Sequence, residues 1–221
     1  AKIHLQKTEM QALQAQINPH FLYNSLSIIN WKAIEAGNDE ISQVTLALST
    51  YYRTSLNKGE TMTIAANELR NIEAYLHIQL VMHDDSFQVE KQVEEKILSC
   101  SVPKLILQPL VENAIHYALE EIMETCYITI QAEELPQDPS GREASLKILV
   151  KNSGSAFEDN LLELLDTQQK TPNRSGIGLL NINKRIKLLF GDAYGLSLYN
   201  EGEFAVAAIT IPYRTEESVS C

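Results

Sequence analysis

The stretch QINPHFLYN, residues 16–24, places a proline within an apparent helix, directly before a histidine. Inside a helix, proline costs about 3 kcal/mol, because a backbone hydrogen bond is lost and the ring clashes with the preceding turn. Asn18 can instead cap a helix that begins at Pro19, or Pro19 can form a hinge that moves His20 between partners. In both interpretations, Asn24 follows His20 by one turn on the same helix face.

The residues around this stretch predict a helical hairpin. Apolar residues of the first helix recur every seven positions, at Ile3, Met10 and Ile17, with Leu13 on the second seam position. After a turn at 36–39, a second helix has apolar residues three and four positions apart, at Ile41, Val44, Leu48 and Tyr51. Because one hairpin buries little apolar surface, we expect two copies to form a four-helix bundle, and therefore a homodimer.

The rest of the chain alternates between helical and strand patterns. Helices are expected from about residue 65, over 104–119, over 157–166 and from 176, and strands at 87–93, 127–133, 145–152, 195–200 and 203–211. This pattern predicts an α/β sandwich, so that the fold class of the whole chain is α+β. We predict a hairpin over 1–61, a second domain over 62–213 and a disordered tail over 214–221.

Composition excludes several function classes. The net charge of −11 across 221 residues argues against direct nucleic-acid binding. The three cysteines are scattered without a Cys/His ligand spacing, which argues against a zinc site. The sequence has no apolar run of the roughly 18 to 20 residues that a membrane span needs.

The segment LQPLVENAIHYAL, residues 107–119, interrupts an apolar helix pattern with polar residues. Glu112 and Asn113 are adjacent, and His116 lies three positions after Asn113 on the same face. Carboxylate and amide oxygens are the ligands that Mg²⁺ prefers, so Asn113 is a candidate metal ligand. A solvated helix edge is the alternative interpretation.

Two glycine-containing segments are candidate phosphate or nucleotide sites. Gly176 and Gly178 form a small-residue turn that opens a helix, whose N-terminal N–H groups can bind phosphate. Asn152 and Gly154 follow an apolar strand in a polar turn that could line a nucleotide pocket. Ordinary glycine-containing loops would show the same patterns.

NPHFLYN, QPLVENAI and GIGLLNINKRIKLLFG occur in an order that resembles the cytoplasmic kinase core of sensor histidine kinases of the LytS and YesM type. The resemblance covers roughly residues 10–213. It implies a dimerisation and phosphotransfer hairpin followed by a GHKL-type (Bergerat) ATP-binding domain. It further implies autophosphorylation from Mg²⁺-ATP, transfer to an aspartate of a response regulator receiver domain, and membrane attachment through a segment upstream of residue 1.

The resemblance also implies roles for individual residues. His20 would be the phosphoacceptor, Asn24 would orient water for dephosphorylation of the regulator, and Asn113 would hold magnesium beside Glu112. The nucleotide would contact a further set of residues, namely His116, Asn152, Gly154, Gly176, Gly178 and Leu179, together with Asn113.

Some positions depart from the family pattern. Asn152 replaces a usual aspartate, Ala156 a usual glycine and His116 a common lysine. These departures leave open a nucleotide-poor pseudokinase that acts as a phosphatase or a dimeric scaffold. A serine kinase or another GHKL-type ATPase is a third possibility. Acid-labile phosphorylation would distinguish the histidine kinase from these alternatives.

Overall fold

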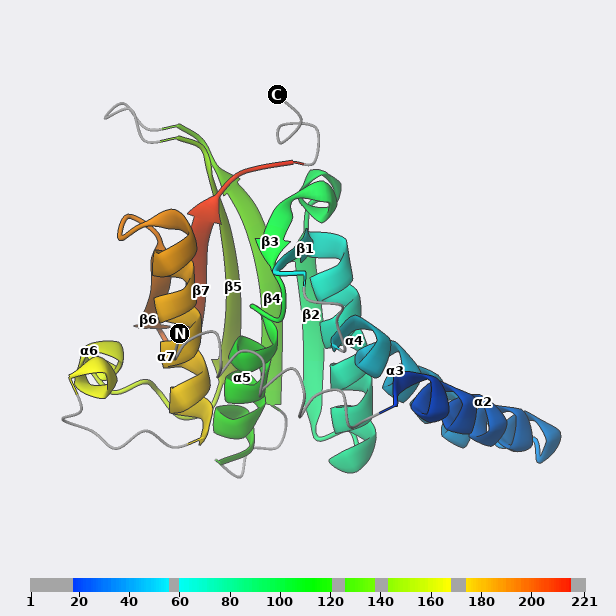
Figure 1. Ribbon diagram of the computed structural model, residues 1–221. Coiled ribbons are helices and arrows are strands. Elements are labelled where there is room, and N and C mark those ends of the chain that lie inside the picture. The colour runs from blue at the N-terminus through cyan, green and yellow to red at the C-terminus, as the bar shows by residue number, and fades with distance from the viewer. Residues whose placement is uncertain (1–17, 56–59, 121–125, 138–142, 168–173, 216–221) are drawn as a thin grey trace.

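A computed structural model describes residues 18–55, 60–120, 126–137, 143–167 and 174–215 (Figure 1). The predicted heptad seam at Ile3, Met10, Leu13 and Ile17 lies outside these residues. Within them, an N-terminal helical hairpin is followed by a layered domain of helices and a mixed sheet.

The hairpin consists of α2 (Pro19–Glu35) and α3 (Asp39–Ser55). Asn18 is the N-cap of α2, and its Oδ1 accepts hydrogen bonds from the backbone N–H groups of His20 (3.1 Å) and Phe21 (3.3 Å). Pro19 thus occupies the first helical position, where a missing N–H is not penalised. The capping interpretation is therefore confirmed, and the hinge at Pro19 stays a prediction, since the residues before Asn18 lie outside the described part of the chain.

The second domain is built on a five-stranded sheet in the order β2-β4-β5-β7-β6. The strands are β2 (Phe87–Val93), β4 (Cys126–Leu135), β5 (Ser145–Ser153), β6 (Gly195–Glu201) and β7 (Phe204–Pro212). β2 and β4 pair in parallel, whereas the other neighbours are antiparallel. Strand patterns in the sequence predicted all five strands; the interior strands β5 and β7 are buried along most of their length.

Three helices cover one face of this sheet (Figure 1). They are α4 (Ala65–Met82), α5 (Gln108–Glu120) and α7 (Arg174–Phe190), while the short α6 (Leu161–Asp166) lies near β6. Buried aliphatic side chains from the central strands meet the helices and form the core, among them Ile130, Ile148 and Ile209. The predicted α/β sandwich is therefore confirmed.

Short elements at one end of this domain were not predicted. β1 (Met62–Ile64) pairs with β3 (Ser101–Pro103), after the 3-10 helix η1 (Glu95–Ser99). The backbone N–H of Ser101 donates to the carbonyl of Arg214 (2.7 Å), and the backbones of Cys100 and Thr215 form an isolated antiparallel β-bridge. The tail predicted as disordered from residue 214 is therefore ordered at Arg214 and Thr215. Main-chain pairing leaves no side-chain pattern, so the sequence alone could not predict this.

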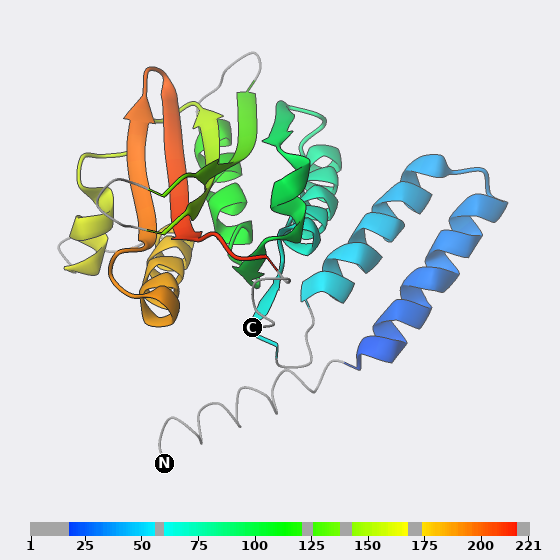
Figure 2. The same ribbon diagram turned by 90° about the horizontal axis from the view of Figure 1, so that it is seen from above.

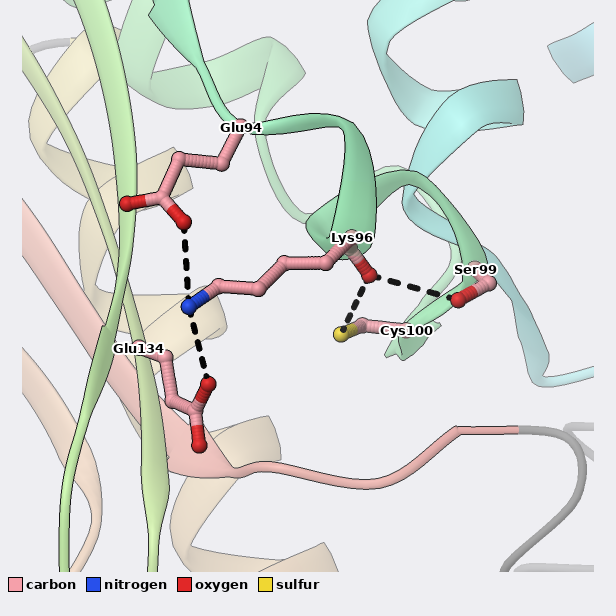
Figure 3. A network of polar contacts seen from close by, with 5 residues as sticks. All are labelled: Glu94, Lys96, Ser99, Cys100 and Glu134. Carbon is pink, nitrogen blue, oxygen red and sulfur yellow. Dashed lines mark hydrogen bonds and ion pairs between the residues drawn. The ribbon is translucent and has the colours of Figure 1, made fainter.

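Figure 3 shows how η1 is fastened to the sheet. Lys96 Nζ lies 3.0 Å from a carboxylate oxygen of Glu94 and 3.1 Å from one of Glu134 on β4. Cys100 Sγ and Ser99 Oγ both contact the Lys96 carbonyl. Because the ion pairs are solvent-exposed, they orient η1 and add little stability.

The hairpin docks on the layered domain through α3. In Figures 1 and 2, α3 lies between α2 and α4. Asn71 Nδ2 of α4 lies 2.6 Å from Thr54 Oγ1 and 3.0 Å from Ser55 Oγ, near the end of α3. The domain boundary at residues 61 and 62 stays a prediction. None of the helices in the described ranges combines the length and the apolar character needed to cross a bilayer.

Candidate functional site

The helix that carries Asn113 begins later than predicted. Residues 104–107 form a turn instead of helix, and Leu105 has a left-handed φ of +53°. The carboxylate of Glu68 on α4 accepts the backbone N–H groups of Leu105 (2.7 Å), Ile106 (2.9 Å) and Leu107 (3.4 Å). A side chain distant in sequence thus replaces the local cap, and α5 starts at Gln108.

Asn113 is a buried polar residue in the helical layer. Only 2% of it is exposed, and its Nδ2 has no hydrogen-bond partner among the described residues. A buried amide nitrogen without a partner is uncommon and marks a position where a ligand group can satisfy it. Because a rotation of 180° about its last torsion exchanges the amide oxygen and nitrogen, the side chain can offer either its oxygen to a cation or its N–H to a phosphate. Asn113 therefore fits both magnesium and a nucleotide.

Glu112 takes part in a hydrogen-bond chain that reaches the hairpin. Gln108 Nε2 donates to Glu112 Oε1 (2.7 Å) and to the hydroxyl oxygen of Tyr51 on α3 (2.7 Å). Burial raises the pKa of the Tyr51 phenol, and the hydrogen bond from Gln108 opposes this shift. Glu112 is thus held by a neighbour on its own helix and lies beside Asn113 in sequence.

The end of β5 approaches α5 closely at Gly154. This glycine has φ +106°, and a Cβ there would lie 2.7 Å from the Tyr117 carbonyl oxygen and 3.2 Å from Ala118 Cα. Asn152, two residues earlier, is 1% exposed, and its Nδ2 donates to the Ser153 carbonyl (2.9 Å). Only glycine allows this contact, which brings the polar end of β5 beside the helix of Asn113.

The predicted glycine turn is instead the first part of α7. The helix starts at Arg174, so that Gly176 and Gly178 are helical and the prediction of a turn before the helix is wrong. A Cβ at Gly178 would lie 3.2 Å from Pro109 Cβ of α5. Gly178 therefore permits close packing of the two helices, while Gly176 and Leu179 are buried. Reading the pattern as a loop missed this helix–helix contact.

His20 and Asn24 occupy one exposed face of α2, as predicted. Asn24 Nδ2 lies 3.4 Å from both ring nitrogens of His20. The structure does not place α2 beside α5, because α2 packs on α3 and α3 packs on α4 (Figure 2). His116 is exposed, and its ring meets that of Tyr117 edge to face at 5.5 Å. His20 is therefore separate from the group on α5, β5 and α7.

Comparison with known proteins places the chain in a family. A family model described as histidine kinase matches residues 8–87. Similar relatives are the sensor histidine kinases YesM of Bacillus subtilis (37% identical over 213 residues, 96% of this chain) and BtsS of Escherichia coli K12 (30% over 216 residues, 97%). The sensor protein LytS of Oceanobacillus iheyensis is 29% identical over 214 residues, 95% of this chain. The chain belongs to the sensor histidine kinase family. It spans about a third of the length of these relatives, 34% to 35%.

Solved histidine kinases share the fold. The catalytic domain of the histidine kinase ThkA superposes with a TM-score of 0.51 at 22% identity, covering 69% of this chain and 95% of that domain. ThkA in complex with the response regulator protein TrrA gives 0.50 at 18% identity, covering 95% of this chain and 61% of that one. The predicted α+β arrangement is therefore that of a histidine kinase.

Within this sensor histidine kinase chain, some residues of the site escaped prediction. Glu68 shapes the turn before α5, and Tyr51 connects the hairpin to Gln108. Glu68 stands directly before Leu69, an apolar position of the amphipathic helix. A charged residue at such a place in the pattern is usually on the solvated face of the helix. No local pattern distinguishes it from a surface glutamate. Within the described ranges, no group of three histidine, cysteine or acidic side chains could hold a metal ion, so a magnesium site would depend on Asn113 and the nucleotide.

Proposed function

We propose that this chain is the kinase core that phosphorylates itself on His20 from Mg²⁺-ATP and passes the phosphoryl group to an aspartate of a response regulator. The observation that carries the proposal is the buried, unpartnered amide nitrogen of Asn113 on α5, the helix that α7 contacts at Pro109 and the end of β5 contacts at Tyr117. Membership of the sensor histidine kinase family supports it.

Residues of the layered domain would bind the nucleotide. Asn113 would hold Mg²⁺ through its amide oxygen, with Glu112 beside it, and the N-terminal end of α7, which contains Gly176 and Gly178, would face the phosphates. Asn152, Gly154, His116 and Leu179 complete the proposed pocket. Bound magnesium would neutralise the phosphate charge that develops during transfer.

His20 would supply the nucleophile. A neutral imidazole keeps a lone pair on one of its two ring nitrogens. That lone pair attacks the γ-phosphorus while the bond to the leaving ADP oxygen breaks, and the ring then releases the proton on its other nitrogen. Asn24, 3.4 Å from the ring nitrogens, would orient the ring and later a water molecule on the phosphorylated regulator.

The hairpin would form the dimer. Exposed apolar side chains line α2 at Phe21 (72% exposed), Ile28 (63%), Trp31 (62%) and Ile34 (55%). Contiguous apolar surface of this kind marks an interaction site, and a second hairpin would cover it in a four-helix bundle. This supports the predicted homodimer.

The regulator is proposed on chemical grounds. The N–P bond of a phosphohistidine breaks as a carboxylate oxygen of the receiver aspartate takes the phosphoryl group. A kinase of the same fold, ThkA, has been solved in complex with the response regulator protein TrrA. We infer a receiver domain as the partner of His20, and attachment of the longer protein to a membrane stays an expectation of the resemblance.

The test is incubation of the purified chain with magnesium and γ-labelled ATP. Acid-labile label is expected in the parent and in His83→Ala, a histidine outside the proposed site, but not in His20→Ala. Asn113→Ala should lose both label and magnesium-dependent nucleotide binding. Label that persists in His20→Ala, or that resists acid, would contradict the proposal.

A failure to label has its own meaning. If the parent stays unlabelled with ATP well above millimolar, the pseudokinase becomes the better interpretation. Asn152→Asp would then restore the charge that the family usually places in the pocket. Recovery of labelling in that variant would assign the loss of activity to Asn152.

A further inference from the structure

Glu68 is a buried acidic residue that no proposed step of the reaction uses. It is 4% exposed, and its two carboxylate oxygens divide three backbone N–H groups between them. Oε1 accepts from Leu105, and Oε2 accepts from Ile106 and Leu107. The carboxylate therefore binds the turn from one side and fixes the direction in which α5 leaves it.

Arg185 of α7 holds the same turn from another helix. Its Nη2 donates to the carbonyl of Lys104 (2.7 Å), the residue directly before those bound by Glu68. Burial lowers the pKa of the Arg185 guanidinium, and the charge of Glu68 opposes that shift. The backbone groups of four consecutive residues, 104–107, are thus hydrogen-bonded by side chains from α4 and α7.

The turn at residues 104–107 directly precedes the place where α5 contacts α7. Pro109, two residues after Leu107, packs against Gly178. A Cβ added at Gly178 would lie only 3.2 Å from the Cβ of Pro109, so the two helices are close together here. Arg185 lies about two turns further along α7 than Gly178. Two separate points therefore fasten α7 to the start of α5.

We propose that Glu68 and Arg185 are positioning residues of the phosphoryl-transfer reaction. Together they clamp residues 104–107 and set the placement of α5, which carries Asn113, against the first turn of α7. This inference rests on the proposed kinase function. It adds a requirement for two residues that touch neither nucleotide nor phosphoacceptor.

The energetics favour positioning over stability as the reason for this clamp. Burial raises the pKa of the Glu68 carboxyl, although the three backbone N–H groups and the charge of Arg185 oppose the rise. Burying a carboxylate costs desolvation free energy, so the residue is weak evidence for a stabilising role. Its presence is explained by the position that it imposes on the turn, since its two oxygens accept three backbone N–H groups from consecutive residues.

The decisive variant is Glu68→Gln, which keeps the shape but has one acceptor oxygen, so that its NH₂ would face a backbone N–H. We expect the autophosphorylation rate at saturating ATP to fall about 10- to 100-fold, because a shift of about 1 Å in a reacting group has that effect. The magnesium concentration for half-maximal rate should rise, whereas nucleotide binding without magnesium should stay nearly unchanged. Arg185→Lys, which keeps the charge and one donor, should show a smaller loss of the same kind.

The matched control is Glu73→Gln on the same helix, where the carboxylate pairs with Lys91 at the surface. It should match the parent in rate and in magnesium requirement. If Glu68→Gln loses magnesium-independent nucleotide binding and rate in proportion, its effect is general unfolding and the inference is wrong. Parent-like rates in both Glu68→Gln and Arg185→Lys would also overturn it.

Amide hydrogen exchange tests the inference even if the parent shows no kinase activity. In Glu68→Gln, exchange should quicken at residues 105–111 and also in the first turns of α7, while β5 and β7 keep the parent rates. Faster exchange confined to residues 105–107 would show that the clamp does not couple the two helices. An unlabelled parent with coupled exchange would refute the proposed function alone.

Discussion

Replacement of Gly154 by alanine should destabilise the layered domain through two separate effects. The residue has φ +106°, where an L side chain is strained by about 1–2 kcal/mol. The added Cβ would also lie 2.7 Å from the Tyr117 carbonyl oxygen and 3.2 Å from Ala118 Cα. Both contacts are backbone atoms of α5, so relief requires movement of β5 or of the helix, which typically costs about 1–3 kcal/mol.

The sum predicts a loss of about 2–5 kcal/mol in the free energy of unfolding. Gly202→Ala is the matched control, because Gly202 has φ +62° but no atom within 4 Å of the added Cβ. It should lose only the conformational part, about 1–2 kcal/mol. Urea unfolding followed by circular dichroism measures both variants against the parent.

The difference between the two variants isolates the contact with α5. We also expect weaker nucleotide binding in Gly154→Ala, because the movement displaces the end of β5 from the helix of Asn113. Equal unfolding free energies for the two variants would refute the reasoning, since the close approach would then have no energetic consequence.

Three further outcomes follow from other parts of the structure. Asn18→Ala should cost about 0.5–2 kcal/mol of helix stability and speed amide exchange in the first turn of α2, and parent-like exchange would contradict the cap. Ile28→Glu should shift the chain toward monomer in sedimentation, whereas Leu188→Glu, at an 87% exposed position on α7, should not; equal masses would exclude the α2 face. Because burial raises the folded pKa of Glu68 above the ordinary 4.5, the folded chain binds more protons between the two values. Relative to Glu68→Gln, the parent should be most stable below pH 4.5 and lose stability as the pH rises through the folded pKa, and urea unfolding without that slope would contradict the burial of the carboxyl.

Local patterns were sufficient for the regular elements. The three-to-four spacing predicted α3, and short runs of apolar and β-branched residues predicted the strands, because these patterns follow from which side chains are buried. The seven-residue seam lies outside the described residues and stays a prediction. Asn18 and Pro19 carried both a capping and a hinge interpretation; the extended backbone of Asn18 confirms the cap, and the hinge stays a prediction. Helix starts were less predictable: α5 begins four residues later than expected, and α7 begins two residues earlier than the glycine turn suggested.

The sequence by itself determined the class of the fold, the family, and most residues of the candidate site, since short motifs such as NPHFLYN and QPLVENAI are contiguous in the chain. Only the tertiary structure decided why Gly154 and Gly178 are glycines, because each is required by a backbone or side chain of α5 that is distant in sequence. It also decided the place of Glu68, whose partners lie 37 to 39 residues away. Hydrogen bonds to backbone groups do not depend on which side chains those partners carry, so no pattern in the sequence records them.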